Sequence, residues 1–280
     1  YPDTQFIAII LEVGFSDLFL KTNRIFDKYI VLDPSIKGNP DFGAFPFPRP
    51  LEINYLNTMP KIITGELPEV PVIGSFGFST PGKCWTSIID AVCEEFQSAI
   101  IKFNIPPAKY VGKRMANECI GKINDHMKEK QAAYTGIKLE ITSNEFTKPE
   151  IIEWCSKNTI NCFFYDRFKI GFVHGLCAVT DQAIASGRPI LITADPTFRH
   201  LHKYIKPWPE QSIKEAILAG NEPVIRIIND WSNDMFIKQF NTMLNTKSTL
   251  DKYNSIPYVE AEDTEELINA NAEAPTAINN

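Results

Sequence analysis

Two short apolar runs near the start of the chain, residues 5–11 and 29–32, are typical of strands in a parallel sheet, because nearly every position rather than every second one is apolar. The stretch that follows, residues 34–71, contains eight of the 20 prolines of the chain. Proline fixes φ and lacks an amide donor, so this stretch is predicted to be neither a helix nor a central strand. Its aromatic side chains indicate an extended connector that is packed against the rest of the protein.

From residue 70 onward the pattern predicts strands that alternate with helices. The first strand is expected over residues 70–78, and the first helix is expected to begin at Pro81 behind an N-cap at Thr80. The apolar stripe of this helix continues at three- and four-residue steps from Trp85 to Phe103. Further strands are predicted at residues 137–142, 161–165 and 189–193, and further helices at 149–157, 179–186, 212–219 and 230–244. This alternation predicts an α/β fold with a doubly wound, Rossmann-like parallel sheet that binds ligands at the carboxyl ends of its strands.

The same pattern divides the chain into three regions. Residues 1–69 are expected to form a partial N-terminal domain with a proline-rich hinge, residues 70–257 a Rossmann-like domain, and residues 258–280 a disordered acidic tail. The tail has six acidic residues, no basic residue and few large apolar groups to bury. The chain begins at Tyr1 without an initiator methionine, which indicates either a processed protein or a fragment.

Charge and cysteine content narrow the classes of function and location. The net charge of −6 comes from the tail, because 28 acidic and 28 basic residues precede residue 258. The body therefore has no basic field to attract nucleic acid or anionic lipid. No apolar run exceeds six residues, which predicts no transmembrane segment. The six cysteines lack CxxC spacing and no N-glycosylation sequon occurs, so a cytoplasmic location is expected.

The first candidate site is the glycine-rich segment 74–83, between the first predicted strand and helix of the Rossmann-like region. Glycine lets the backbone approach a ligand closely, and Lys83 offers a charge to a diphosphate. The segment matches neither the Walker loop nor the GxGxxG motif of dinucleotide binding. The alternative is a glycine-rich turn with a solvated lysine.

The second candidate site combines the strand-end Asp166 with Asp181, which falls in a small apolar helix. Carboxylates at strand ends suit the paired hydroxyls of a sugar or ribose. Asp166 could equally form a surface ion pair with Arg167. Asp181 could equally be a first-turn acid that complements the helix dipole.

A third candidate site is the segment containing Arg199 and His200. The histidine could act as an acid or base, or donate to a phosphate, or it could pack locally at the start of a helix. No metal site is expected, because the four histidines offer one close pair and no cysteine at ligand spacing. No serine nucleophile elbow and no cysteine nucleophile signature occurs, so the catalytic residues are unknown.

Taken in order, residues 71–83, 163–166, 181–190 and 197–200 resemble the C-terminal half of GT-B-fold glycosyltransferases of the family 1/4-like kind. The resemblance covers about residues 5–245. It implies a GT-B-type C-terminal domain with a truncated N-terminal portion. It also implies that this domain binds a nucleotide-sugar, which is the donor substrate and not a cofactor, and that no metal is required.

The resemblance assigns donor-binding roles to individual residues. Gly74, Ser75, Phe76 and Gly77 would line the donor diphosphate, and Lys83 would pair with it. The donor site would also include Asp166 and Gly175, with Arg199 and His200 as further candidates. The glutamate with which this family binds the ribose is replaced, so the ribose acceptor is either Asp181 or Gln182.

The resemblance implies transfer of a sugar from a nucleotide-sugar to an unknown saccharide, lipid or protein acceptor. The alternative is a non-catalytic nucleotide- or sugar-binding module derived from a glycosyltransferase, which the missing glutamate and the short N-terminal portion favour.

Overall fold

The computed structural model describes residues 4–11, 26–40, 43–52, 61–108, 112–166 and 175–247. The predicted disordered tail, residues 258–280, and the predicted partner Arg167 lie outside the described residues. The division of the chain into three regions stays a prediction.

The described elements form two groups of strands in chain order. The first group is β1 (Ile7–Ile10), β2 (Lys28–Val31) and β3 (Ala44–Pro46). The second group, with its helices, is β4 (Val72–Phe76), α2 (Trp85–Glu95), β5 (Ala99–Asn104), α3 (Gly112–Gln131), β6 (Ile137–Thr142), α4 (Lys148–Ser156), β7 (Ile160–Phe163), α5 (Val179–Ala185), β8 (Ile190–Ile192), the 3₁₀ helix η3 (Pro196–Phe198), α6 (Ile213–Ala219), α7 (Glu222–Asp230) and α8 (Asn233–Asn245).

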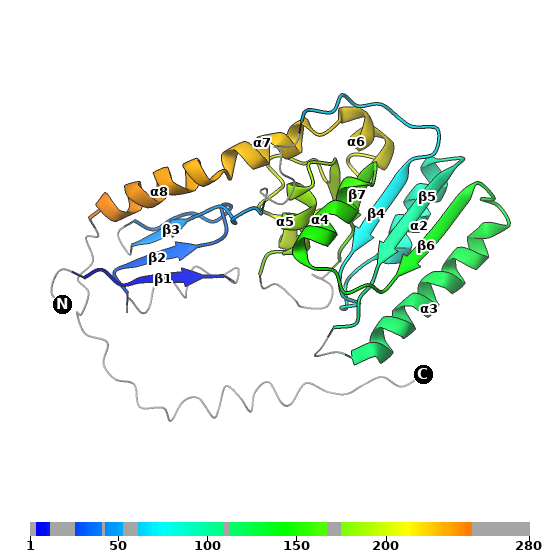
Figure 1. The fold of residues 1–280 in the computed structure, drawn as a ribbon, viewed down its shortest axis with the longest axis horizontal. Helices are drawn as coiled ribbons and strands as arrows, with labels where there is room; N and C mark the ends of the chain where they lie inside the picture. Colours follow the sequence, from blue (N-terminus) through cyan, green and yellow to red (C-terminus); the bar gives the residue numbers. More distant parts are fainter. Residues whose placement is uncertain are drawn as a thin grey trace.

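The second sheet is parallel throughout, with strand order β6-β5-β4-β7-β8. The chain therefore moves outward from β4 to β6, returns across the sheet to β7 and continues to β8. Helices α2, α3 and α6 pack on one face, and α4, α5 and α7 pack on the other (Figure 1). This is the predicted doubly wound arrangement, and the prediction of an α/β fold with a Rossmann-like parallel sheet is confirmed.

The central strands of this sheet are apolar on both faces because helices cover both. All four residues of β7 and all three of β8 are buried. In β7, Cys162 packs in the core beneath α2, whereas Phe163 packs in the core beneath α4 and α5. The continuous apolar runs in the sequence follow from this burial on two sides.

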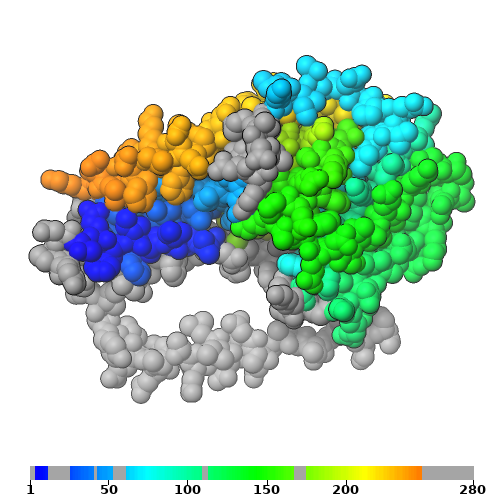
Figure 2. All heavy atoms as spheres, in the orientation of Figure 1, coloured from blue at the N-terminus to red at the C-terminus, as the bar shows by residue number. Residues whose placement is uncertain are grey.

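The first sheet has the strand order β1-β2-β3 and is also parallel. Helix α8 lies along it, and Figure 2 shows this orange helix resting on the blue strands. Met243 of α8 is fully buried against Ile30 of β2 and Phe47, and Phe236 and Phe240 extend the same contact. The helix predicted at residues 230–244 thus packs on the first sheet, although the sequence pattern assigned it to the Rossmann-like region.

The predicted first helix of the Rossmann-like region is wrong at both ends. Helix α2 begins at Trp85, with Cys84 as its N-cap, and it ends at Glu95. The apolar positions after residue 98 belong to β5, where Ala99, Ile101 and Phe103 are buried at every second position. Apolar residues recur every three or four positions in a helix and every two positions in a strand. The two spacings coincide at some of these positions, which is why the apolar stripe of the helix seemed to continue to Phe103. Helices α3 and α7 were not predicted.

Met243→Ala should lower the stability of the first sheet, because it opens a cavity between α8 and β2 that the surroundings fill only in part. Substitutions of this kind cost about 2–5 kcal/mol. The matched control is Met235→Ala on the same helix, whose side chain is 44 % exposed; a change of roughly 0.5 kcal/mol or less is expected there. Thermal unfolding of both variants, followed by hydrogen exchange of the β2 amides, measures the difference. Equal effects of the two substitutions would contradict the packing described.

Candidate functional site

A cavity of about 610 Å³ lies at the carboxyl ends of the strands of the second sheet; it is called the switch-point cavity here. It sits between β4 and β7, where the order in which strands are added to the sheet reverses, which is where open α/β sheets bind ligands. Its lining residues come from the loops that follow β4 to β7 and from the start of α4 and α5: Phe76, Gly77, Phe78, Thr80, Lys83, Asn104, Pro106, Pro107, Asn144, Glu145, Phe146, Lys148, Ile151, Tyr165, Leu176, Cys177, Ala178, Val179 and Gln182.

Backbone contacts fix the loop between β4 and α2 against the segment that follows β7. Lys83 and Tyr165 form an antiparallel bridge. On either side, the amide of Cys84 donates to the carbonyl of Phe164 at 2.8 Å, and the amide of Asp166 donates to the carbonyl of Gly82 at 2.8 Å. These contacts hold residues 82–84 in a non-helical conformation, in which Gly82 has a φ of +79°, and this is why the helix does not begin at Pro81.

This bridge places the Lys83 ammonium on the wall of the cavity. Its Nζ lies 5.3 Å from the centre of the Tyr165 ring and 5.7 Å from the centre of the Trp85 ring. A Cβ atom at Gly77 would come within 2.3 Å of this Nζ, and Gly77 has a φ of +129°, which side-chain-bearing residues rarely adopt. Glycine at position 77 is therefore needed both for the turn and for the position of the ammonium group.

Four residues of the predicted donor site lie on the cavity wall: Phe76, Gly77, Lys83 and Gln182. Gly74 and Ser75 lie inside β4. A Cβ at Gly74 would come within 2.0 Å of the Asn158 Nδ2, so Gly74 leaves room for the buried amide pair in which Asn158 donates to Asn161 at 2.8 Å. Packing against this amide pair thus explains why residue 74 is a glycine. A donor-binding role for Gly74 or Ser75 stays a prediction.

Asp166 and Gly175 lie next to the cavity lining in the chain. Asp166 follows Tyr165, and its backbone is tied to Gly82. Gly175, at a φ of +77°, precedes the lining residue Leu176. Their donor-binding roles stay predictions.

Asp181 lies away from the switch-point cavity and forms an ion pair with Arg49 of the first region. Its Oδ2 accepts a hydrogen bond from the Arg49 Nε at 2.6 Å, and the two side chains are 13 % and 18 % exposed. Burial raises the pKa of the Asp181 carboxyl to about 6, and the Arg49 guanidinium opposes this shift only in part. The sequence left Asp181 and Gln182 as alternative ribose acceptors, and of the two only Gln182 lies on the switch-point cavity wall.

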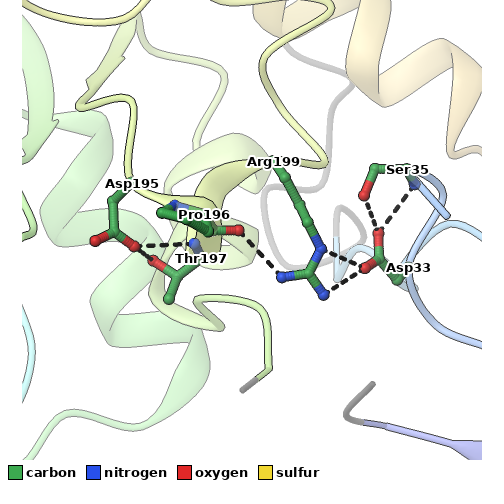
Figure 3. A network of polar contacts seen from close by, with 6 residues as sticks. All are labelled: Asp33, Ser35, Asp195, Pro196, Thr197 and Arg199. Carbon is green, nitrogen blue, oxygen red and sulfur yellow. Dashed lines mark hydrogen bonds and ion pairs between the residues drawn. The ribbon is translucent and has the colours of Figure 1, made fainter. Parts of the chain in front are cut away.

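Arg199 also reaches from the second sheet's region to the first. Figure 3 shows its guanidinium between the carbonyl of Pro196 and the carboxylate of Asp33. The Arg199 Nε and Nη2 lie 2.8 Å and 2.6 Å from the Asp33 Oδ2. Asp33 also accepts a hydrogen bond from the Ser35 amide at 2.9 Å. The position of Arg199 is thus explained by a contact between the two regions.

His200 is buried, and its ring stacks on Trp231 with centroids 5.7 Å apart and an interplanar angle of 20°. Neither ring nitrogen has a hydrogen-bond partner within the described part of the chain. Burial, together with the nearby charges of Arg49, Arg199 and His202, lowers the pKa of the imidazole to about 3. His200 is therefore neutral at physiological pH and is placed as a packing residue; the donor-binding role suggested for it stays a prediction.

Several lining residues were not predicted, and one of them, Asn104, was missed because its strand β5 was missed. Asn104 ends β5, and Asn144, Phe146 and Lys148 follow β6. The amide of Asn104 is used to hold this wall: it donates to the Asn144 carbonyl at 3.1 Å and accepts from the Asn144 amide at 3.0 Å. The alternating pattern of residues 99–104 was the signal that could have revealed β5 and Asn104, whereas the position of Asn144, Phe146 and Lys148 after the predicted strand β6 was the signal for the other three.

No group of three or more His, Cys, Asp or Glu side chains is arranged to hold a metal ion within the residues that the structure describes. Over the same residues, no helix combines the length and apolar character needed to cross a bilayer.

Asp181→Asn should change how stability depends on pH. A carboxyl whose pKa rises from 3.8 to about 6 on folding binds its proton more tightly in the folded state, so its contribution is present at low pH and is lost as the pH rises through about 6. The asparagine variant lacks this loss. Its melting temperature relative to the parent protein should therefore increase between about pH 4.5 and about pH 7.5, as measured by calorimetry.

The contribution of His200 to stability depends on pH with the opposite sign, because the pKa of its imidazole is lowered on folding. It is present in both proteins, so the difference between them removes its effect. A difference in melting temperature that does not vary with pH would show that Asp181 does not titrate in this range.

The sequence matches no protein-family model and no curated protein. Among solved structures, the chain is similar to HepE from Anabaena in complex with UDP, with a TM-score of 0.52, 11 % identity and coverage of 85 % of this chain and 71 % of that one. It also matches UDP-forming trehalose-phosphate synthases from Burkholderia vietnamiensis and Burkholderia xenovorans, at TM-scores of 0.49 and 0.48, each with 8 % identity over 72 % of this chain. The chain spans about half the length of these synthases, 53 % and 52 %. The predicted resemblance of fold is thus confirmed: the chain is an α/β protein of parallel sheets with the fold of GT-B glycosyltransferases over most of its length.

Proposed function

We propose that the chain binds a nucleotide-sugar in the switch-point cavity and acts as a glycosyltransferase. The observation that carries this proposal is the position of the Lys83 ammonium, held by the bridge to Tyr165 at the carboxyl ends of β4 and β7. A volume of about 610 Å³ is within the range of small-molecule sites. That the similarly folded HepE was solved with UDP supports the choice of a nucleotide as ligand.

Lys83 is proposed to pair with the diphosphate of the donor. The leaving nucleoside diphosphate gains negative charge as the bond to the sugar breaks, and a cation fixed in advance stabilises that charge without reorganising. The glycine at position 77 lets the diphosphate and the ammonium approach each other closely.

Gln182 is proposed as the ribose partner, because its neighbour Asp181 is engaged by Arg49. An amide can donate and accept hydrogen bonds with a ribose hydroxyl, although without the charge of a carboxylate.

All six cysteines are thiols rather than disulfides, which supports the proposed location in the reducing cytoplasm.

A non-catalytic nucleotide- or sugar-binding module is the second candidate. The observation that favours it is Gln182, a neutral side chain where this family uses a carboxylate. Release of UDP from a UDP-sugar, measured with and without an acceptor, separates the two candidates. A glycosyltransferase releases UDP, even if slowly, whereas a binding module binds the donor and leaves it intact.

Lys83→Ala should weaken UDP binding roughly tenfold to a hundredfold, since a charge-assisted contact to phosphate is worth about 1.5–3 kcal/mol. Uridine, which lacks phosphates, should bind both proteins equally. Isothermal titration measures each affinity, and circular dichroism checks the fold.

Lys128→Ala is the matched control. Its ammonium is 72 % exposed and pairs with Asp125 at 3.2 Å on α3, away from the cavity lining. UDP affinity should be unchanged in this variant. Equal UDP affinities in the Lys83 variant and the parent protein would remove Lys83 from the site, and a parent protein that binds none of UDP, ADP and GDP would end the proposal.

A further inference from the structure

A second cavity, of about 370 Å³, lies between the first region and the helices α4 and α5; it is called the hinge cavity here. Four charged side chains line it: Arg49 and Glu52 from the segment after β3, Lys148 from α4, and Asp181 from α5. None of the residues that the sequence predicted to contact the donor diphosphate lines this cavity.

The four charges pair with one another. Arg49 pairs with Asp181 at 2.6 Å, and the Lys148 ammonium donates to one oxygen of Glu52. The cluster therefore carries no net charge, so a ligand with a strong charge of its own is not favoured there.

Each carboxylate nevertheless keeps one buried oxygen without a hydrogen-bond donor in the described part of the chain: Oδ1 of Asp181 and Oε2 of Glu52. An unpartnered buried polar atom costs free energy, and buried polar groups in folded proteins nearly always have partners. Both oxygens belong to residues that line the hinge cavity, so the donor they lack is expected to come from a molecule inside it.

We propose that the hinge cavity binds a saccharide through its hydroxyl groups. Hydroxyls supply the two missing donors and leave the neutral charge balance unchanged. Leu32, Pro50 and Ile152 provide an apolar wall for the C–H face of a sugar ring. The cavity volume falls in the range of sites that take small ligands.

The two cavities are neighbours, since Lys148, Ala178 and Gln182 line both. A saccharide in the hinge cavity would lie beside a nucleotide-sugar in the switch-point cavity. This names the class of acceptor, a saccharide, and in this respect the inference rests on the proposed function.

Saturation-transfer NMR on the full chain tests the proposal, with and without UDP. The probes are D-glucose, D-galactose, D-mannose, N-acetyl-D-glucosamine and myo-inositol, each added singly. At least one sugar should receive magnetisation from the parent protein. Its affinity should fall roughly tenfold or more in Glu52→Gln and in Asp181→Asn, because each variant loses a charged acceptor.

Glu69→Gln, a change at an exposed acid of the segment before β4, is the matched control and should bind the sugar as the parent does. If Asp181→Asn does not fold, Glu52→Gln decides alone, because Glu52 is one-third exposed. The proposal is overturned if no sugar binds the parent protein, or if sugar binding survives both substitutions. UDP binding without any sugar binding overturns this inference alone, whereas loss of UDP binding in the parent overturns the proposed function.

Discussion

The position of β4 at the centre of the second sheet is the constraint on which the candidate site depends. Its parallel ladders to β5 on one side and to β7 on the other bring the ends of β4 and β7 together, although more than 80 residues separate them in the chain. The loop after β4 then has a neighbouring backbone to bridge with. Without that bridge at Tyr165, residues 82–84 would be free to start the helix early, and Lys83 would lose its place above Gly77.

Gly74 shows that the pairing of β4 with β7 leaves no room for a side chain at this position. The pairing of β4 with β7 includes Gly74 opposite Asn161, and the missing side chain at position 74 leaves space for the amides of Asn158 and Asn161. A glycine-rich segment between a strand and a helix suggests a ligand loop, yet one of its glycines serves sheet packing and another serves the position of an ammonium group. The spacing of glycines in the sequence does not separate these two uses.

The sequence was informative wherever a local pattern decides the structure. The buried strands β2, β4, β7 and β8 are mostly apolar, and the glycine-rich segment lies at a strand end, so the fold class and part of the cavity wall were predicted. Strand β5 was missed because its alternation followed directly on a helical stripe. The pairs Arg49–Asp181 and Asp33–Arg199 join residues 132 and 166 positions apart, and no local pattern specifies such partners.

The two ion pairs that join the regions have opposite polarity. The first region contributes the base Arg49 to one and the acid Asp33 to the other. Each is largely buried, and removing one partner from a buried pair costs about 3–5 kcal/mol because the other charge is left uncompensated. A sliding movement of one region over the other would separate both pairs at once, so the relative position of Arg49 and α5 is well defined.

Helix α5 connects the contact between the regions to the two cavities. Successive residues of a helix point about 100° apart, so Asp181 and Gln182 cannot serve the same wall equally. Asp181 turns to Arg49 and the hinge cavity, whereas Gln182 reaches the wall of both cavities. Because Asp181 is held by a residue of the first region, the orientation of Gln182 depends on the contact between the regions. The binding proposed for either cavity would therefore be linked to that contact through one turn of helix.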